Sequence, residues 1–576
     1  MAQVMFPFGA HSITNRMRGF DYMSASDKKK LRKEQAAAQL TERQLKELAE
    51  AKKIKRLSIA FVVIMLAVAL TAVSILGVRA VNNSGIIDKN TIAAVTGEHK
   101  LSSVQMNYYL GDVIRNQYNQ WSSMYGESLS MYMMMSGLNV NQPLNEQVIN
   151  QETGETWADS FVSQAMDKAL SDYALYDKAM AEGFKLTEEE ESSLKVNIEQ
   201  MKLYAMYYGY KNPNKYLQAI YGYGSTVESY DEYARVSYIA SAYYTKNRDA
   251  LNYDDAAIRA EDNKDLNKYS AFSYASYYLS SSTFLTGGTK DDKGTVTYSD
   301  AEKEAALKKA EEAANSLLSA KDIIDLDTAI KALEINKDNK SAASTVNTLV
   351  MYSDIPASMQ SWIADKAREH GNITVIPNES TSKDAEGKET KTVNGYYVVL
   401  FQNKDENLRK LANVRHLLVQ FEGGTTGSDG TKTYSDAEKA TAKAEAEKLL
   451  QEWKDGAATE ESFIELVKKH SDDGSKEEGG LFEGIHRQSN YVDSFKNWSV
   501  DSARKHGDTE VILSEYGYHV MFYVGDDELT YRDYMISEDL RATDIEKWHS
   551  DILKTTTIKA ENTKRLNTDV IMANLG

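Results

Sequence analysis

The 576-residue chain contains no cysteine and only five prolines. Without cysteine there can be no disulfide bond, thiolate nucleophile, thiolate metal site or lipid anchor on an N-terminal cysteine. An extracytoplasmic protein without thiols also avoids stray disulfide pairing. Proline is far below its usual share of about 5%. Folding of the chain itself should therefore depend little on slow prolyl isomerisation.

One hydrophobic core cannot organise a chain of this length, because domains usually hold about 100–200 residues. Aliphatic and aromatic residues make up 42% of the chain, which is ordinary for a folded protein. We therefore expect an elongated protein of several domains.

A long apolar run lies near the N-terminus. Residues 57–78 carry no charge and are bounded by Arg56 and Arg79. At about 1.5 Å per residue, a helix of this length crosses a hydrocarbon core of about 30 Å. A cleaved signal peptide is the alternative, but the run exceeds the usual apolar region of about 7–15 residues and no clear small-x-small site follows. The sequence predicts an uncleaved, single transmembrane helix at 57–78.

Charge is distributed unevenly around this run. Residues 1–56 hold thirteen lysines and arginines and six acidic residues, a net charge of +7 in a chain of net charge −18. The positive-inside rule places this arm in the cytoplasm and the bulk of the chain outside the cell membrane. The arm could bind nucleic acid, but its position beside the membrane favours anionic lipid. The acidic exterior argues against a nucleic-acid partner there.

After a linker at 79–91, a mostly helical domain is expected at 92–267. It starts with a short strand at Ile92, a turn at Gly97, a second strand and a helix from about Ser102. Apolar residues at spacings of three and four mark a helix over 166–179. Tyrosine and methionine are dense in this region. Such side chains suit a surface for varied unfolded segments, although packing between helices is the alternative.

Two blocks of sequence return 136 residues later in the chain. Residues 298–303 (YSDAEK) recur at 434–439, and the pattern W-x-x-D-x-A-R-x-H-G of 362–371 recurs at 498–507. What both copies share is interpreted as scaffold, and what one copy alone has is candidate chemistry. The histidine before each repeated glycine, His370 or His506, is expected at a helix C-terminus.

The sequence of the second copy, at 410–525, predicts a definite order of strands and helices. A strand with His416 is followed by helices from Ser435 to Trp453 and from Glu461 to His470, then by a loop and a short helix, and finally by a strand with His519. This order predicts an α+β domain.

Four motifs of this copy resemble the parvulin-type peptidyl-prolyl isomerases. They are V-R-H-L-L-V at 414–419, F-x-x-L-V-x-x-x-S-x-D at 463–473, the glycine pair at 479–480 and G-Y-H-V at 517–520. The resemblance implies that residues His416 and His519 are paired at the bottom of a catalytic site, with Asp473 at the family's Cys/Asp position. It implies a proline pocket lined by Tyr491 and Phe495. The family's G-G-D-L-G is altered here, which leaves Leu481 and Phe482 as candidates for the pocket wall.

The first copy, at 268–403, lacks this set of side chains. Tyr397 is expected in place of His519 and Tyr277 in place of His416, and the glycine pair is missing. We therefore expect an inactive, parvulin-like binding or spacer domain.

Residues 95–102, 169–183 and 186–190 resemble motifs of the N-terminal chaperone domain of PrsA/SurA foldases. In those proteins a C-terminal segment completes the N-terminal domain, which the tail at 526–576 would then do here. This tail is predicted to form a helix over 531–553 and a strand over 555–559. An ordinary terminal helix on the second copy is the alternative.

The histidine and aspartate set also suggests a metal site or, with Ser471, hydrolysis. A metal site needs a third ligand and an open position that the sequence does not specify. Hydrolysis through Ser471 lacks a nucleophile-elbow pattern. His470, His486 and His549 are interpreted as surface or core residues. No metal or cofactor is expected.

The sequence thus predicts a multidomain α+β protein with one transmembrane helix, a helical chaperone domain and two tandem parvulin-like domains. Its predicted function is that of a membrane-anchored extracytoplasmic foldase. It would bind unfolded secreted proteins and isomerise X-Pro bonds of proline-containing peptides in the second copy alone. The alternative is a non-catalytic holdase or assembly scaffold with two inactive binding domains. Clients and oligomeric state do not follow from the sequence.

Overall fold

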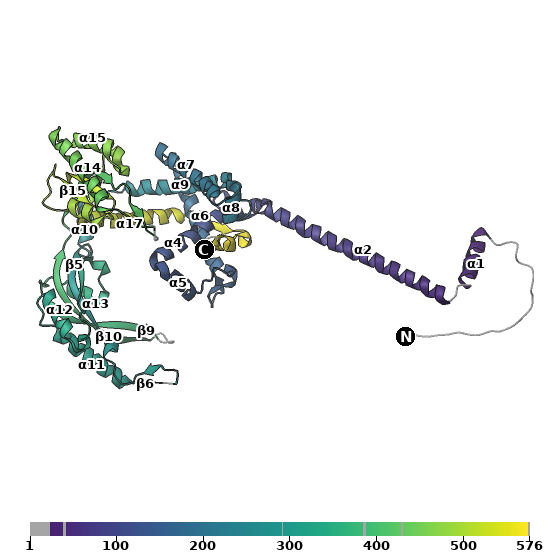
Figure 1. The fold of residues 1–576 in the computed structure, drawn as a ribbon, viewed down its shortest axis with the longest axis horizontal. Helices are drawn as coiled ribbons and strands as arrows, with labels where there is room; N and C mark the ends of the chain where they lie inside the picture. Colours follow the sequence, from purple (N-terminus) through teal and green to yellow (C-terminus); the bar gives the residue numbers. More distant parts are fainter. Residues whose placement is uncertain (1–23, 39–41, 291, 384–387, 428–429, 574–576) are drawn as a thin grey trace, which may run out of the picture. The chain divides into compact units, whose positions relative to one another are not determined.

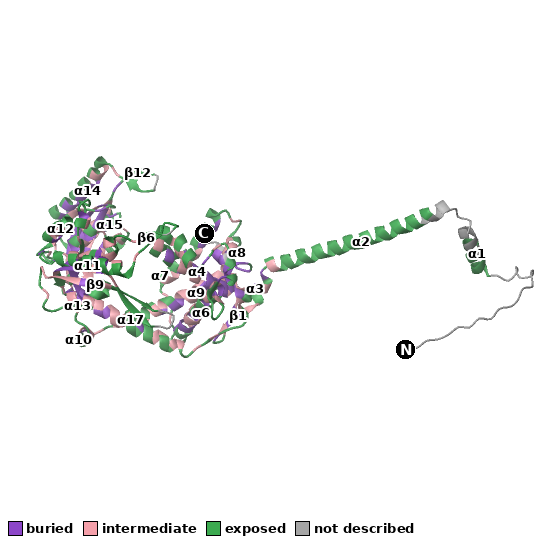
Figure 2. Cartoon of the chain, turned by 90° about the horizontal axis from the view of Figure 1, so that it is seen from below, coloured by how far each residue is buried: buried purple, intermediate pink, exposed green. Residues whose placement is uncertain are grey.

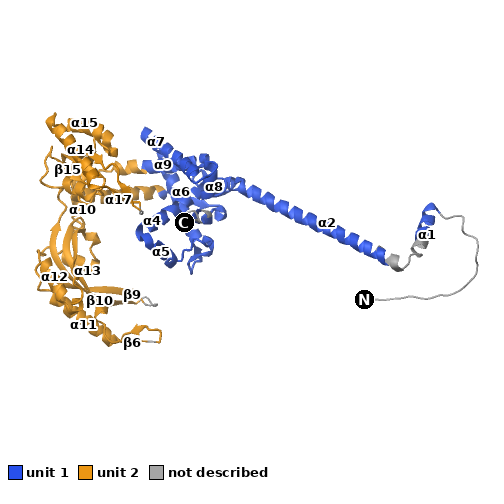
Figure 3. Cartoon of the chain, viewed as in Figure 1, with its two compact units in different colours: residues 1–243, 553–576 blue, residues 244–552 orange. Residues whose placement is uncertain are grey.

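The computed structural model describes residues 24–38, 42–290, 292–383, 388–427 and 430–573. The chain divides into two compact units, which Figure 3 colours blue and orange. Unit 1 comprises residues 1–243 and 553–576, and unit 2 comprises residues 244–552. Residues 244–267 therefore belong to unit 2, whereas the sequence analysis placed them in the helical domain expected at 92–267.

Unit 1 consists mostly of helices (Figure 1). Its helices are α1 (Ala25–Ala38), α2 (Glu42–Asn83), α3 (Ile86–Asn90), α4 (Ser103–Tyr125), α5 (Leu129–Met135), α6 (Trp157–Ala181), α7 (Glu188–Tyr207), α8 (Pro213–Tyr221), α9 (Val227–Asp249) and α18 (Thr568–Ala573). Its strands are β1 (Ile92–Thr96), β2 (His99–Ser102), β3 (Val148–Asn150), β4 (Glu155–Thr156) and β17 (Ile558–Ala560). Helix α9 belongs to unit 1 as far as Tyr243.

Helix α2 contains the apolar run. Within the described part of the chain, Ala49–Asn83 is the one helical stretch long and apolar enough to cross a membrane. Its most apolar window has a mean hydropathy of 2.9 and no buried residues, and Figure 2 shows the stretch from residue 49 to residue 81 as exposed. A row of exposed apolar side chains is unfavourable in water.

The folded body of unit 1 begins with the expected hairpin. Strands β1 and β2 pair antiparallel around Gly97, whose φ of 55° suits glycine. Ser102 then caps α4 through a capping box with Gln105. Strand β17, from the far end of the sequence, pairs antiparallel with β1, with Ala94 opposite Ala560.

Some aromatic and methionine side chains of unit 1 are buried, and others are exposed. Tyr108 and Tyr109 are fully buried in its core, where their rings pack against Tyr233 at 5.3 and 4.8 Å. Met134 and Tyr207, in contrast, are 73% and 83% exposed. Some tyrosines of unit 1 are therefore part of its core, and others lie on its surface.

Unit 2 contains two four-stranded antiparallel sheets. The elements around the first are α10 (Asp255–Asp262), β5 (Ala271–Ser280), β6 (Thr289–Lys290), β7 (Val296–Thr297), α11 (Asp300–Ser316), α12 (Ile323–Ala332), β8 (Thr345–Met351), α13 (Ala357–Ile363), β9 (Ile373–Lys383) and β10 (Glu389–Asp405). Those around the second are β11 (Lys410–Gln420), β12 (Thr425–Thr426), β13 (Lys432–Thr433), α14 (Asp436–Asp455), α15 (Glu460–His470), β14 (Leu481–Ile485), α16 (Asp493–Ser499), β15 (Thr509–Leu513), β16 (Gly517–Thr530) and α17 (Tyr531–Leu553). The helix predicted over 531–553 is confirmed.

The two sheets have corresponding strand orders, β8-β5-β10-β9 and β14-β11-β16-β15. Side chains alternate between the two faces of each sheet. In the second sheet, Val520 and Phe522 pack with residues of α14 and α15, whereas Met521 and Tyr523 pack with residues of α16. Both faces of the sheet are thereby buried.

The repeated sequence blocks form the same contacts twice. Ser299 caps α11 in a capping box with Glu302, and Ser435 caps α14 in the same way with Glu438. Arg368 lies over the Trp362 ring at 3.8 Å, and Arg504 lies over the Trp498 ring at 4.4 Å. These shared residues hold the scaffold, as the sequence comparison predicted.

The expectation for His370 and His506 was wrong. Helices α13 and α16 end well before them, at Ile363 and Ser499. Nδ1 of each histidine lies close to a backbone carbonyl, that of Gln402 at 3.0 Å or Val524 at 2.8 Å. The following glycines have φ values of 82° and 85°, so these positions are tight turns.

Candidate functional site

Two histidines meet on one face of the second sheet. His416 lies on β11 in alternation with Val414, and His519 lies on the neighbouring β16 in alternation with Met521. Their Nδ1 atoms are 2.9 Å apart. The residues are only 2% and 5% exposed, so the pair is buried within the domain.

A chain of polar contacts continues from both rings. Nε2 of His519 is 2.7 Å from Oγ of Ser514. Nε2 of His416 lies 3.4 Å from Oδ1 of Asp473, which is long for a hydrogen bond, and this buried nitrogen makes no hydrogen bond within the described residues. The backbone N–H and the hydroxyl of Ser475 both donate to the same carboxylate oxygen.

The proton positions follow from the groups at the two ends. The contact with His416 and the hydrogen bonds from Ser475 hold the pKa of the Asp473 carboxyl well below its usual range. A carboxylate only accepts, so His416 carries its proton on Nε2 and accepts at Nδ1. His519 then donates from Nδ1 and accepts at Nε2 from Ser514. One proton on each ring is consistent with the two hydrogen bonds of His519 and with the 3.4 Å contact between His416 and Asp473.

Burial is also the main reason why His519 is uncharged. It lowers the pKa of His519 to about 4, and repulsion by His416 adds to this effect. The Asp473 charge acts in the opposite direction but is the weakest of the three influences. At neutral pH the imidazole of His519 is therefore neutral, in keeping with the tautomers assigned above.

Asp473 is placed by the segment that follows α15. Oγ of Ser471 accepts the backbone N–H of Leu418 at 3.1 Å and that of Asp473 at 3.2 Å, which ties this segment to β11. Asp473 then caps a short 3-10 turn, Gly474–Glu478. Its side chain is 28% exposed, so the carboxylate is more accessible than the histidines.

Three aromatic rings cover the histidine pair. The rings of Phe482 and Phe495 lie edge-on to His416, with centroids 5.0 and 5.2 Å away. The Tyr491 ring packs on both, at 5.5 and 5.4 Å. Phe495 is 3% exposed and Tyr491 is 38% exposed. Tyr491 thus forms the outer surface of an apolar cluster whose inner wall is Phe495.

Leu481 lies elsewhere. It pairs with Arg415, on the face of the sheet opposite to His416, whereas Phe482 pairs with Val414 on the histidine face. The structure therefore brings together six of the seven residues that the sequence singled out, namely His416, Asp473, Phe482, Tyr491, Phe495 and His519, and separates Leu481 from them.

The glycine pair at 479–480 explains how the chain directly before β14 approaches β11. Gly480 has a φ of 66°, and a Cβ there would lie 2.1 Å from the carbonyl oxygen of His416. Its own carbonyl accepts the N–H of His416 at 2.9 Å. Only glycine allows this approach, so Gly480 fixes the backbone that carries the histidine.

Ser514 and Gly480 were not among the predicted site residues. Ser514 lies in the turn between β15 and β16, and one serine in a polar turn gives no signal in the sequence. The glycine pair was noted as a motif, but its contact with His416 requires three-dimensional information.

The alternative chemistries find no support in the described residues. The two Nδ1 atoms face each other, so neither is open to an ion, and no group of three or more His, Cys, Asp or Glu that could hold a metal occurs in the described ranges. Ser471 uses its hydroxyl on two backbone N–H groups, rather than on a histidine.

The first sheet carries different side chains at the equivalent positions. Ser276 pairs with Val399 as His416 pairs with Met521, and Val399 follows Tyr397 by two residues. The expectation that Tyr277 replaces His416 was therefore wrong: Ser276 does. Tyr277 lies on the opposite face with the core of α11 and α12.

Comparison with known proteins identifies the second sheet and its helices. Residues 396–524 match the family model described as the PPIC-type PPIASE domain. None of the curated proteins compared with the chain matches it.

The solved structures that are similar to this chain include three described as PrsA. Peptidylprolyl isomerase (PrsA) from Bacillus anthracis is 20% identical over 26% of this chain and 59% of its own, with a TM-score of 0.17. PrsA from Bacillus subtilis is 17% identical over 28% and 56%, with a TM-score of 0.18. Foldase protein PrsA from Streptococcus pneumoniae is 10% identical over 68% and 80%, with a TM-score of 0.21. The chain thus spans well under two thirds of the length of the first two.

Proposed function

We propose that the PPIC-type PPIase domain of this chain catalyses cis/trans isomerisation of X-Pro peptide bonds, within a membrane-anchored foldase that also binds unfolded secreted proteins. The observation that carries the proposal is the His416, His519 and Asp473 set beneath the rings of Phe482, Tyr491 and Phe495. The family match over residues 396–524 supports it.

The reaction needs no covalent intermediate and no cofactor. Rotation about the C–N bond has a barrier of about 18–20 kcal/mol because amide resonance is lost. An acceleration of about 10⁵ requires about 7 kcal/mol of preferential binding of the twisted amide. The residues of the site must therefore distinguish the twisted from the planar form.

Asp473 can make this distinction electrostatically. Resonance places part of a negative charge on the carbonyl oxygen, and rotation removes it. A carboxylate beside that oxygen destabilises the planar form more than the twisted one. Asp473 is the charged group of the set with an accessible side chain.

The aromatic cluster supplies the proline slot in this proposal. A pyrrolidine ring in contact with Phe495 is removed from water, which strengthens the effect of Asp473. Because Phe495 lies beneath Tyr491, the Tyr491 ring must turn aside to admit the proline.

The two histidines act as positioning residues. Both are almost fully buried, so substrate does not reach them directly. Their hydrogen bond and the contact of His416 with Asp473 fix the direction of the carboxylate. Their replacement should reduce turnover through misplacement of Asp473 rather than through loss of proton transfer.

The first sheet is proposed to be an inactive relative of the second. At its equivalent positions Ser276 and Tyr397 replace the histidines, and Asn347 lies opposite Tyr274 as Phe482 lies opposite Val414. The amide of Asn347 donates to the Ser276 hydroxyl at 3.2 Å. A polar amide where the second sheet has an apolar wall does not favour a proline ring.

Anchoring and topology are supported by the apolar helix and by charge. The stretch Ala49–Asn83 contains the predicted membrane helix at 57–78, and the basic residues of 1–56 favour a cytoplasmic N-terminus. The bulk of the protein would then face the extracytoplasmic side, where it meets secreted chains.

A proline-peptide isomerisation assay with the full-length protein tests the enzymatic part. We expect acceleration over the spontaneous rate, and a loss of it when His416 and His519 are both replaced by alanine. A folded protein with no acceleration would favour the alternative of a non-catalytic holdase. Suppression of client aggregation, measured on the same two proteins, tests the chaperone part and should survive the histidine substitutions.

A further inference from the structure

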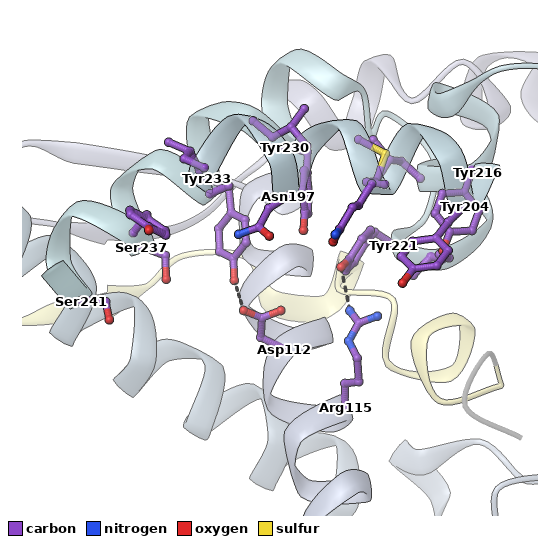
Figure 4. A pocket seen from close by; sticks show the side chains of 18 residues that line it. Asp112, Arg115, Asn197, Tyr204, Tyr216, Tyr221, Tyr230, Tyr233, Ser237 and Ser241 are labelled. Carbon is purple, nitrogen blue, oxygen red and sulfur yellow. Dashed lines mark hydrogen bonds between the residues drawn. The ribbon is translucent and has the colours of Figure 1, made fainter. Parts of the chain in front are cut away.

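A cavity of about 520 Å³ lies among four helices of unit 1. Helices α4, α7, α8 and α9 line it, and Figure 4 shows it from close by. Its volume falls within the range of about 300–1,000 Å³ that is typical of binding pockets. None of its lining residues takes part in the site around His416.

Tyrosine dominates the lining of this cavity. The six tyrosines are Tyr204, Tyr216, Tyr221, Tyr230, Tyr233 and Tyr238. Each offers an apolar ring face and a hydroxyl that can donate or accept, at a low cost in conformational entropy. Such walls tolerate different side chains in a ligand while still forming hydrogen bonds.

A carboxylate and a guanidinium project into the same space. Asp112 and Arg115 are three residues apart on α4 and therefore lie on one face of the helix. Figure 4 shows Asp112 directed toward Tyr233 and Arg115 directed toward Tyr221. The Tyr233 hydroxyl donates to Asp112, and Nη2 of Arg115 donates to the Tyr221 hydroxyl at 2.7 Å.

Both charged groups retain unused hydrogen-bonding capacity. Within the described residues these two hydrogen bonds are the ones that their side chains make. A carboxylate has several acceptor sites and a guanidinium has five N–H donors. The cavity therefore offers a strong acceptor and a strong donor side by side.

The two charges of the lining cancel, which indicates the charge of the ligand. A ligand with net charge would be attracted by one of the two groups and repelled by the other, so the pair does not favour a charged ligand of either sign. A polypeptide backbone is neutral and alternates N–H donors with C=O acceptors, so it suits both. The side-chain amides of Asn197 and Gln200, which also line the cavity, can donate to and accept from the same backbone groups of a polypeptide.

Exposed apolar side chains continue from the cavity along the end of α7. Tyr204 lines the cavity and is 53% exposed, and Leu203, Met206 and Tyr207 beside it are 62%, 73% and 83% exposed. This continuity gives a bound chain a second surface for its apolar side chains, beyond the cavity itself.

We propose that this cavity binds the backbone of an extended, uncharged segment of a non-native polypeptide. The inference rests on the proposed chaperone function and gives it a location and a chemistry. Recognition through backbone groups explains how one site can accept clients of different sequence. Binding here is independent of proline and of the residues around His416.

Fluorescence anisotropy with a short labelled peptide tests the proposal on the full-length protein in lipid nanodiscs. The peptide contains valine, serine and glutamine, without proline or charge. Arg115→Gln should weaken its binding about tenfold or more, because a charged hydrogen bond is lost. Lys195→Gln, on the exposed side of α7, is the matched control and should bind as the unsubstituted protein does. A backbone N-methylated peptide should also bind about tenfold more weakly.

Tyr204→Ser and Gln200→Ala provide a second pair of variants if Arg115→Gln does not fold, since both side chains are exposed. They should weaken binding severalfold. Wild-type affinity in folded cavity variants, or equal affinity for the N-methylated peptide, would overturn the proposal. The His416 and His519 double variant should bind the peptide normally, so a failure of the isomerase assay and a failure of this inference give different results.

Discussion

His416 and His519 share one proton between their Nδ1 atoms, which lie 2.9 Å apart. Only one of the two rings can donate in this contact, and Asp473 at one end and Ser514 at the other decide which one does. The carboxylate is thereby coupled to a serine on another turn, through two buried rings.

Ser514→Ala should disturb the site without touching the reacting groups. The substitution leaves Nε2 of His519 buried without a donor, which costs about 1–3 kcal/mol. We expect lower stability of the second sheet by hydrogen exchange and a severalfold lower kcat/KM. Ser502→Ala, a substitution of a serine outside the network, is the control. Unchanged exchange and activity in Ser514→Ala would contradict the coupling of Ser514 to the histidine pair.

Acid should weaken the second sheet in a defined pH window. The pKa of His519 falls from 6.5 to about 4 on folding. Between these values the unfolded chain binds a proton that the folded protein does not, so stability falls as the pH drops from 6.5 to 4 and is unaffected above 6.5. The loss amounts to about 3 kcal/mol at most.

The measurement is hydrogen exchange of β11 and β16 in the protein and in His519→Leu, compared at each pH. The difference between the two should shrink steadily on acidification through this window. Asp473, whose pKa is also lowered by folding, should add a further loss below about pH 4. A difference independent of pH would exclude His519 as the titrating group.

Gly480→Ala should be among the most damaging single substitutions of the second sheet. A Cβ at this position meets the His416 carbonyl oxygen, and the positive φ adds strain. We expect a loss of about 2 kcal/mol or more of stability and most of the isomerase activity, measured by urea unfolding and the peptide assay. Gly474→Ala is the matched control, because a Cβ there has open space.

Activity should depend on one sheet alone. Replacement of His416 and His519 by alanine should lower kcat/KM by about 100-fold, as expected when a catalytic group is misplaced. Tyr397→Ala, at the register position of His519 in the first sheet, should leave kcat/KM unchanged. Residual activity that depended on Tyr397 would assign catalysis to the first sheet.

Local patterns predicted much of the fold. The helices expected from about Ser102 and from Ser435 begin at these capping residues, because a cap depends on neighbours within one turn. The helix of 531–553 has the predicted ends. Helix caps and helix ends can be predicted because they depend on only a few neighbouring residues in the sequence.

Positions that depend on register could not be predicted in the same way. Tyr277 was assigned to the position of Ser276. The segment from Ser276 to the YSDAEK block is four residues longer in the first copy than the segment from His416 in the second copy, which breaks the constant offset between the copies. A slip of one residue moves a side chain to the other face of the sheet. The prediction that Leu481 lines the pocket was wrong for the same reason, because Phe482, and not Leu481, lies on the face of the sheet that carries the histidines.

The pairing of β17 with β1 has a consequence for the order in which the chain folds. Strand β1 is complete once residue 96 has emerged, but its partner β17 begins only at residue 558. During vectorial synthesis the three-stranded sheet of unit 1 therefore waits for nearly the whole chain, while unit 2, which is continuous in sequence, can fold first. A chain whose synthesis has not yet reached β17 would present an open strand edge on β1, which invites aggregation.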